Sequence, residues 1–210
     1  MKMNKEQTIY EYLSLLIPNP KCELNYNTDY ELLIAIMLSA QTTDKRVNKV
    51  TSILFNKYPN LKTLKDAKKE DIEQIVRELG SFHKKSKAVI DIVNIIYNNY
   101  NGIVPQKRFL LEQLPLVGRK TTNVFLSEYY KVPNIAVDTH VERVSKRLKL
   151  AKEKDTVLEI EKKLKRKFPK ETWNDLHLRL VLFGRYYCTA RTPNCKNCKL
   201  KEYCNYKNKS

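Results

Sequence analysis

Glycine is scarce in this chain of 210 residues, which contains only four. Alternating apolar and polar stretches, the pattern of β-strands, are also almost absent, whereas apolar residues recur at helical spacing nearly everywhere. No apolar run approaches the roughly 18 residues that a membrane-spanning helix needs, which argues against an integral membrane protein. These absences predict an all-α protein, long enough for one domain or for two compact halves.

Acidic residues are few, because 23 Asp and Glu stand against 40 Lys and Arg and give a formal net charge of +17 at pH 7. The basic excess is spread along the chain, which favours a polyanionic partner, and nucleic acid is the commonest such partner. The alternative is a lysine-rich protein from a compositionally biased genome, as the abundance of Lys, Asn, Tyr and Ile also suggests. Charge alone does not separate these two interpretations.

Capping signals and apolar spacing mark the expected helices. Thr28 with Glu31 predicts a capping box ahead of an apolar run, and Asp44 is expected to cap the next helix. The most apolar segment, 88–96, covers most of a helix circumference and is expected to be buried on several sides, with Gly102 closing its helix. Later helices are expected at residues 120–130, 138–148, 156–168 and 172–187.

Four of the five cysteines lie close to the C-terminal end with the spacing C-x6-C-x2-C-x5-C; they are Cys188, Cys195, Cys198 and Cys204. Disulfides are disfavoured, because no secretory segment precedes the body of the chain and Cys22 would stay unpaired, so we expect an intracellular protein with reduced thiols. Structural zinc usually takes two C-x-x-C pairs, and only one is present. An iron-sulfur cluster with four thiolate ligands is the third interpretation. The spacing alone does not choose among them.

A turn containing Pro and Gly, LPLVGRKTT at residues 114–122, opens directly onto a predicted helix. Free backbone N–H groups and the positive end of the helix dipole suit a phosphate at such a position. Lys120 lies in the first helical turn, where the dipole and Arg119 both disfavour its ammonium form, so its amine is a candidate nucleophile for a Schiff base. Asp138 begins the next helix, where a carboxylate can cap the helix and also serve as an acid or base.

The combination of these features resembles the endonuclease III family of base-excision DNA glycosylases, which have a helix-hairpin-helix motif and a 4Fe-4S cluster. The resemblance covers nearly the whole chain, from LSAQTTD at residues 38–44 through the turn at 114–120 and VDTH at 137–140 to the cysteine spacing. It implies that Lys120 is the nucleophile and Asp138 the catalytic carboxylate. It also implies that Cys188, Cys195, Cys198 and Cys204 hold the 4Fe-4S cluster.

Two helical domains flanking a DNA-binding cleft are expected from this resemblance. Pro133 ends the helix that begins at Lys120, and the apolar face of the N-terminal segment needs a partner. We therefore expect a six-helix, barrel-like domain at residues 22–132, which contains the helix-hairpin-helix, and an iron-sulfur domain formed by residues 1–21 together with 133–210.

The resemblance also implies which residues contact DNA. Gln41 is expected to fill the space that a rotated base leaves, and Ser81, where the family typically has leucine, or Phe82 is expected to act as a second wedge. Leu116 replaces the first glycine of the hairpin, and its side chain is expected to restrict the approach of the backbone to phosphate. The remaining expected contacts are Val117, Gly118, Arg119, Thr121 and His140. Arg191 is added because the stretch 185–210 has seven basic residues against one acidic residue, which favours contact with the DNA backbone.

The function implied is that of a bifunctional enzyme of base excision repair acting on oxidised pyrimidines. After the damaged base rotates out of the duplex, Lys120 attacks the sugar C1′, the base leaves, a Schiff base forms and elimination breaks the strand on the 3′ side. The alternatives are a monofunctional adenine-mismatch glycosylase and a non-catalytic DNA-binding module. The expected partner is double-stranded DNA with damaged bases or abasic sites, bound by a monomer in the cytoplasm, at the nucleoid if the source is bacterial.

Overall fold

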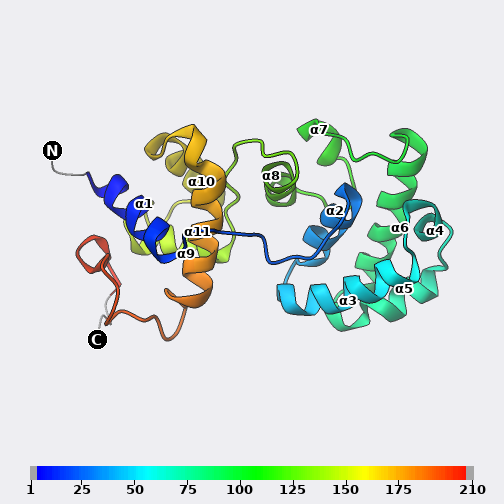
Figure 1. Ribbon diagram of the computed structural model, residues 1–210, viewed down its shortest axis with the longest axis horizontal. Coiled ribbons are helices and arrows are strands. Elements are labelled where there is room, and N and C mark those ends of the chain that lie inside the picture. The colour runs from blue at the N-terminus through cyan, green and yellow to red at the C-terminus, as the bar shows by residue number, and fades with distance from the viewer. Residues whose placement is uncertain (1–3, 207–210) are drawn as a thin grey trace. The chain divides into compact units, whose positions relative to one another are not determined.

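The computed structural model describes residues 4–206, and every regular element in this range is a helix. The prediction of an all-α fold is therefore confirmed. The chain forms two compact units, one of Glu23–Tyr130 and one of residues 4–22 together with 131–206 (Figure 1). Among the described residues, none of the helices combines the length and the apolar character needed to cross a membrane.

The unit Glu23–Tyr130 is built around a helix that is buried on every side. This helix, α2 (Asp29–Leu38), has an uninterrupted apolar run from Leu32 to Leu38, and all residues from Tyr30 onward are buried. It packs against α3 (Asp44–Lys57), α6 (Phe82–Asn99) and α8 (Arg119–Glu128) (Figure 1). The other elements are α4 (Leu61–Lys65), α5 (Lys69–Val76), the 3-10 helix η1 (Arg77–Leu79) and α7 (Arg108–Leu111).

Helix α6 contains the segment 88–96, which was expected to be the helix buried on several sides. That prediction is confirmed, because every residue of this segment is buried or partly buried. The exposed face of α6 carries Lys84, Lys87 and Tyr97, which lie before and after the segment. Lys87 pairs with Asp91 one turn later at 2.7 Å, which keeps this face polar. Its buried face consists of Lys85, Ser86, Ala88, Val89, Ile92, Val93 and Ile96.

The helix starts differ in two details from the predicted caps. The Thr28 hydroxyl accepts the Glu31 N–H at 3.4 Å, but the Glu31 carboxylate accepts the N–H of Asn27 at 2.6 Å rather than that of Thr28. The capping box is therefore only half formed. At α3 the cap is Thr43, whose hydroxyl accepts from the third helical residue, and Asp44 is already the first helical residue, where its charge suits the helix dipole.

The second unit joins the N-terminal helix to the C-terminal half of the chain. Ile9 and Leu13 of α1 (Lys5–Leu16) belong to the same buried core as residues of the later helices, and α1 packs on α11 (Figure 1). Arg179, which is 5% exposed, donates to the carbonyls of Ile17 and Pro18 at 3.1 and 3.3 Å and so fixes the end of α1. The later elements are α9 (Thr139–Arg147), α10 (Val157–Lys167), η2 (Lys170–Thr172), α11 (Trp173–Tyr186) and η3 (Lys201–Tyr203).

Helices α9 and α11 cross closely at Gly184. A Cβ atom added at Gly184 would lie 2.9 Å from the Cβ of His140, 3.1 Å from Val144 Cγ2 and 3.2 Å from the His140 carbonyl oxygen. Distances this short leave no room for a methyl group, since two of these three atoms sit close to the backbone of α9. The Gly184 carbonyl also accepts a hydrogen bond from Arg143 Nη2 at 2.6 Å.

Gly184→Ala is expected to destabilise the protein by about 1 to 2 kcal/mol, because overpacking at the crossing outweighs the better helix propensity of alanine. Denaturant unfolding followed by circular dichroism measures the change. Gly118→Ala is the matched control, because a Cβ there meets no atom within 4 Å and the backbone φ is −97°. Equal unfolding midpoints for the two variants would contradict the proposed crowding.

Candidate functional site

The loop between α7 and α8 contains a tight turn closed by the Val117 N–H, which donates to the Leu114 carbonyl at 3.1 Å. Pro115 occupies the second position of this turn, and Leu116 occupies the third with a φ of 59°. A proline followed by a left-handed residue is the pattern of a type II turn, whose third position favours glycine or asparagine. Leu116 therefore holds a conformation that costs an ordinary residue about 1 to 2 kcal/mol. Its side chain is 55% exposed.

Helix α8 begins at this turn without a side-chain cap. Gly118 is the N-cap and has no side chain to accept from the N–H groups of the first turn. Neither its φ of −97° nor any neighbour requires glycine, since a Cβ there would meet no atom within 4 Å. The space in front of the backbone is open, and together with the positive end of the helix dipole it suits an anionic group such as phosphate.

The side chains around this helix start divide into exposed and buried ones. Arg119 and Lys120 are exposed, and Thr121 is partly buried. Val117 is only 3% exposed, so its side chain anchors the turn in the core and leaves just its backbone for a ligand. The structure therefore presents an exposed lysine amine in the first turn of α8, next to the open space at Gly118.

Gln41 and Ser81 lie on two other loops of the same unit. Both are exposed, and both have left-handed backbones, with φ of 59° and 46°. Such conformations are uncommon for residues other than glycine and are typically held in place by their surroundings. Phe82 is partly buried, with its ring centroid 3.9 Å from that of His83. Of the two residues predicted as the second wedge, Ser81 is thus the more exposed.

Asp138 is the N-cap of α9, in the second unit. One of its oxygens, Oδ1, accepts the N–H groups of His140 and Val141 at 2.9 and 2.8 Å, which confirms the predicted cap. The other oxygen, Oδ2, takes no part in the cap. The His140 ring is partly buried, and its Nδ1 lies 3.2 Å from Arg143 Nη2. The cap therefore fixes the carboxylate while leaving one of its oxygens available for other contacts.

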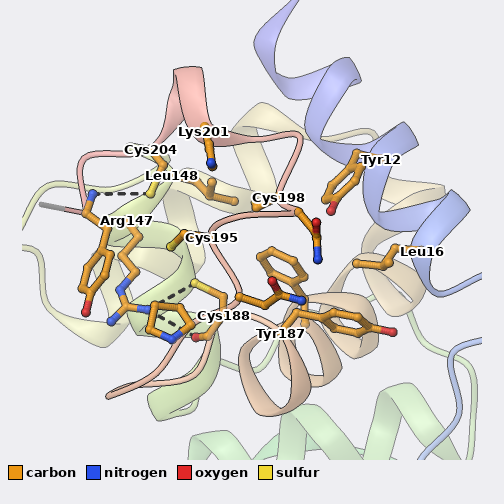
Figure 2. A pocket seen from close by; sticks show the side chains of 15 residues that line it. Tyr12, Leu16, Arg147, Leu148, Tyr187, Cys188, Cys195, Cys198, Lys201 and Cys204 are labelled. Carbon is orange, nitrogen blue, oxygen red and sulfur yellow. Dashed lines mark hydrogen bonds between the residues drawn. The ribbon is translucent and has the colours of Figure 1, made fainter. Parts of the chain in front are cut away.

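All four C-terminal cysteines line one cavity of about 100 Å³, together with Tyr12 and Leu16 of α1 (Figure 2). None is in a disulfide. Burial raises the pKa of Cys188 and Cys198, and at Cys188 a hydrogen bond from Arg147 opposes this rise. Within residues 4–206, no three His, Cys, Asp or Glu side chains are grouped so that they could hold one metal ion. The arrangement is four partly buried thiols distributed around a shared space.

Arg147, at the end of α9, organises the loop that follows Cys188. Its Nη1 lies 3.3 Å from the Cys188 sulfur and donates to the Thr189 carbonyl at 2.7 Å, while Nη2 donates to the Ala190 carbonyl at 3.0 Å. Figure 2 shows the guanidinium beside Cys188. The sequence did not single out Arg147, since it is one of many basic residues at helix ends. The same loop carries Arg191, which is exposed.

Comparison with known proteins matches residues 34–170 to the family described as "HhH-GPD superfamily base excision DNA repair protein". Endonuclease III of Bacillus subtilis is 46% identical over 90% of this chain and 86% of its own length. Endonuclease III of Haemophilus influenzae is 42% identical over 99% of both chains.

A solved structure described as a trapped endonuclease III–DNA covalent intermediate in an estranged-adenine complex has the same fold. Its TM-score is 0.91 at 44% sequence identity, and the alignment covers 97% of this chain and 97% of that one. The sequence identity, the coverage and the structural agreement extend over nearly the whole chain. The chain therefore belongs to the endonuclease III family of base-excision DNA repair enzymes.

Proposed function

We propose that Lys120 is the nucleophile with which this enzyme removes oxidised pyrimidines from double-stranded DNA and cleaves the strand at the resulting abasic site. Membership of the family makes the chain a DNA glycosylase and abasic-site lyase of base excision repair. The observation that carries the assignment to Lys120 is its exposed amine in the first turn of α8, beside the open backbone at Gly118. A DNA phosphate bound at that helix start brings the attached sugar to the amine.

The proposed reaction needs an amine that can form and break a carbon–nitrogen bond. Lys120 Nζ attacks C1′ of the lesion nucleotide, the bond from C1′ to the base breaks, and the base leaves with a proton. The C1′–O4′ bond of the sugar then breaks, and O4′ takes up the remaining proton of the amine, so that a Schiff base forms between Nζ and C1′. This Schiff base makes the C2′ proton acidic. Loss of this proton expels the 3′ phosphate and breaks the strand. The covalent intermediate trapped with the similar endonuclease III is consistent with a covalent route.

Asp138 is the carboxylate that we propose acts on the same nucleotide. Its Oδ1 is occupied by the N–H groups of His140 and Val141, so the side chain is held in one orientation. In this orientation Oδ2 can stabilise positive charge that develops on the sugar, or can accept a proton. An Asn at this position would keep the cap, because asparagine caps helices about as well as aspartate, but would lack the negative charge.

The other predicted site residues are proposed to contact DNA either in the vacated base stack or along the phosphate backbone. Gln41 and Ser81, both exposed on left-handed loops, fill the space vacated by the lesion base, and Phe82 supports the second loop from its partly buried position. The backbone from Val117 to Thr121 holds phosphate, and Leu116, Arg119, His140 and Arg191 contact DNA nearby. We propose that a monomer acts on chromosomal DNA in the cytoplasm.

The four cysteines are proposed to hold a 4Fe-4S cluster, which the family is known to carry. Their thiols line one cavity, and such a cluster takes one thiolate on each iron, so its ligands need not converge on a single ion. The cluster would cross-link a segment with little core of its own. Within residues 189–206, Leu200 is the only buried residue. The bonds from the four cysteines would therefore determine how this segment folds.

Protein prepared without oxygen is expected to be coloured by thiolate-to-iron charge transfer and to contain about four irons per chain. Cys198→Ser should lower the iron content and increase proteolysis of the C-terminal segment. Cys22→Ser is the matched control, because Cys22 lies far from the four cysteines in the sequence and does not line the cavity, and it should keep full iron content. Colourless wild-type protein that contains one zinc per chain would contradict the assignment.

Lys120→Gln is expected to abolish both borohydride trapping on abasic DNA and strand cleavage, because glutamine has no nucleophilic amine. Binding to abasic DNA should persist and should weaken steeply with added salt, since the other phosphate contacts remain. Lys107→Gln removes the same charge from an exposed position ahead of α7 and should still cleave. Cleavage by Lys120→Gln at near the wild-type rate would show that another amine is the nucleophile.

Asp138→Asn should release the base more slowly than the wild type does, while its melting temperature should equal that of the wild type.

Leu116→Gly is expected to tighten binding to duplex DNA, because the left-handed third position of the turn suits glycine and the exposed side chain no longer limits the approach of phosphate. Fluorescence anisotropy with abasic-site DNA measures the affinity. Leu116→Ala keeps a Cβ in the left-handed conformation and should bind more weakly than Leu116→Gly. If both variants bind DNA as the wild type does, Leu116 does not limit affinity.

A further inference from the structure

Lys85, in the first turn of α6, is a buried lysine with only 5% of its surface exposed. Lysine is rarely buried unless its charge is compensated. Here Nζ donates three hydrogen bonds to backbone carbonyls, those of Leu38 at 3.0 Å, Ala40 at 2.9 Å and Leu79 at 2.9 Å. An ammonium group has three N–H donors, so each one has a carbonyl partner.

The three carbonyls belong to two loops that are far apart in the sequence. Leu38 is the last residue of α2, and Ala40 directly precedes Gln41. Leu79 ends η1 and is followed by Gly80 and Ser81. Helix ends leave carbonyls without partners and carry the negative end of the helix dipole, so both sites favour a cation. A single ammonium group thus joins the C-terminal ends of two helices.

The residues that follow these carbonyls are held in unusual backbone conformations. Gln41 has a φ of 59° and Ser81 a φ of 46°, and Gly80 between Leu79 and Ser81 has a φ of 66°. A left-handed backbone is strained for a residue other than glycine and persists where the surroundings fix it. The hydrogen bonds from Lys85 to Ala40 and Leu79 supply such fixation at both loops.

We propose that Lys85 is a positioning residue that locks the Gln41 loop and the Ser81 loop together, so that both side chains meet the DNA as one preorganised unit. This inference rests on the proposed function, in which Gln41 and Ser81 fill the space left by the lesion base. Rotating a base out of the duplex costs free energy, because its stacking and pairing are lost. Loops that are already fixed lose less conformational entropy on binding than loops that must become ordered. More of their interaction free energy therefore remains to offset the cost of base rotation.

The test compares two substrates in single-turnover cleavage assays with Lys85→Met. The first is a fully paired duplex containing thymine glycol, which requires base rotation and filling of the stack. The second carries a preformed abasic site opposite a one-nucleotide gap, so that no base is rotated and no partner base is left behind. Lys85→Met should lower the rate on the first substrate by roughly 10- to 100-fold. On the second substrate the loss should be much smaller.

Lys84→Met is the matched control, because Lys84 is the neighbouring lysine, has the same charge and is exposed. It should leave the ratio of the two rates unchanged. An equal loss on both substrates with Lys85→Met would mean that Lys85 only supports the fold, and no loss on either would also overturn the proposal. Wild-type protein without activity on either substrate would instead refute the proposed function.

Circular dichroism melting shows whether Lys85→Met folds. If it does not, the proposal is tested with Lys85 intact, through Gln41→Ala, Ser81→Ala and the double variant on the thymine glycol duplex. Loops that act as one unit should give non-additive losses in rate. Additive losses would show that the two loops work independently and would overturn the proposal.

Discussion

An α-helix leaves N–H groups at its start and carbonyl groups at its end without partners, and the ways in which this chain satisfies them organise its functional residues. The end of α2 and the end of η1 share the Lys85 ammonium. The start of α9 is satisfied by Asp138, which at the same time fixes a carboxylate. The start of α8 receives no side-chain cap, since its N-cap is Gly118. The first two arrangements rigidify the protein, and the third leaves donors for a ligand.

Several features that depend on neighbouring residues were predictable from the sequence, whereas most features that depend on tertiary contacts were not. The helical character and the Asp138 cap follow from local pattern and were confirmed. The central position of α2 was not predicted, because apolar composition does not show how many helices will surround a segment. Lys85 and Arg147 gave no signal among 40 basic residues, since their roles arise from carbonyls far away in the sequence. Leu116 was noticed as a departure from the family, but only the structure showed its left-handed backbone.

Different interactions stabilise the two units. The unit Glu23–Tyr130 surrounds an apolar helix, so burial of ordinary side chains supports it. Within residues 189–206 only Leu200 is buried, and polar contacts add to this small core. They run from Arg147 to the carbonyls of Thr189 and Ala190 and to the Tyr206 ring, whose centroid lies 4.1 Å away. This difference agrees with the proposal that the cysteines of that segment hold a cluster, which would supply order that burial does not.

The ribosome makes helix α1 well before it makes the residues that cover this helix. Arg179, which fixes the end of α1 through the Ile17 carbonyl, lies 162 residues further along the chain. At a synthesis rate of about 5 to 20 residues per second, α1 waits roughly 8 to 30 s for this partner. During that time the unit Glu23–Tyr130 can be completed, whereas Ile9 and Leu13 have no core to enter. The apolar face of α1 is thus a surface that the cell must keep from aggregating until α11 has emerged.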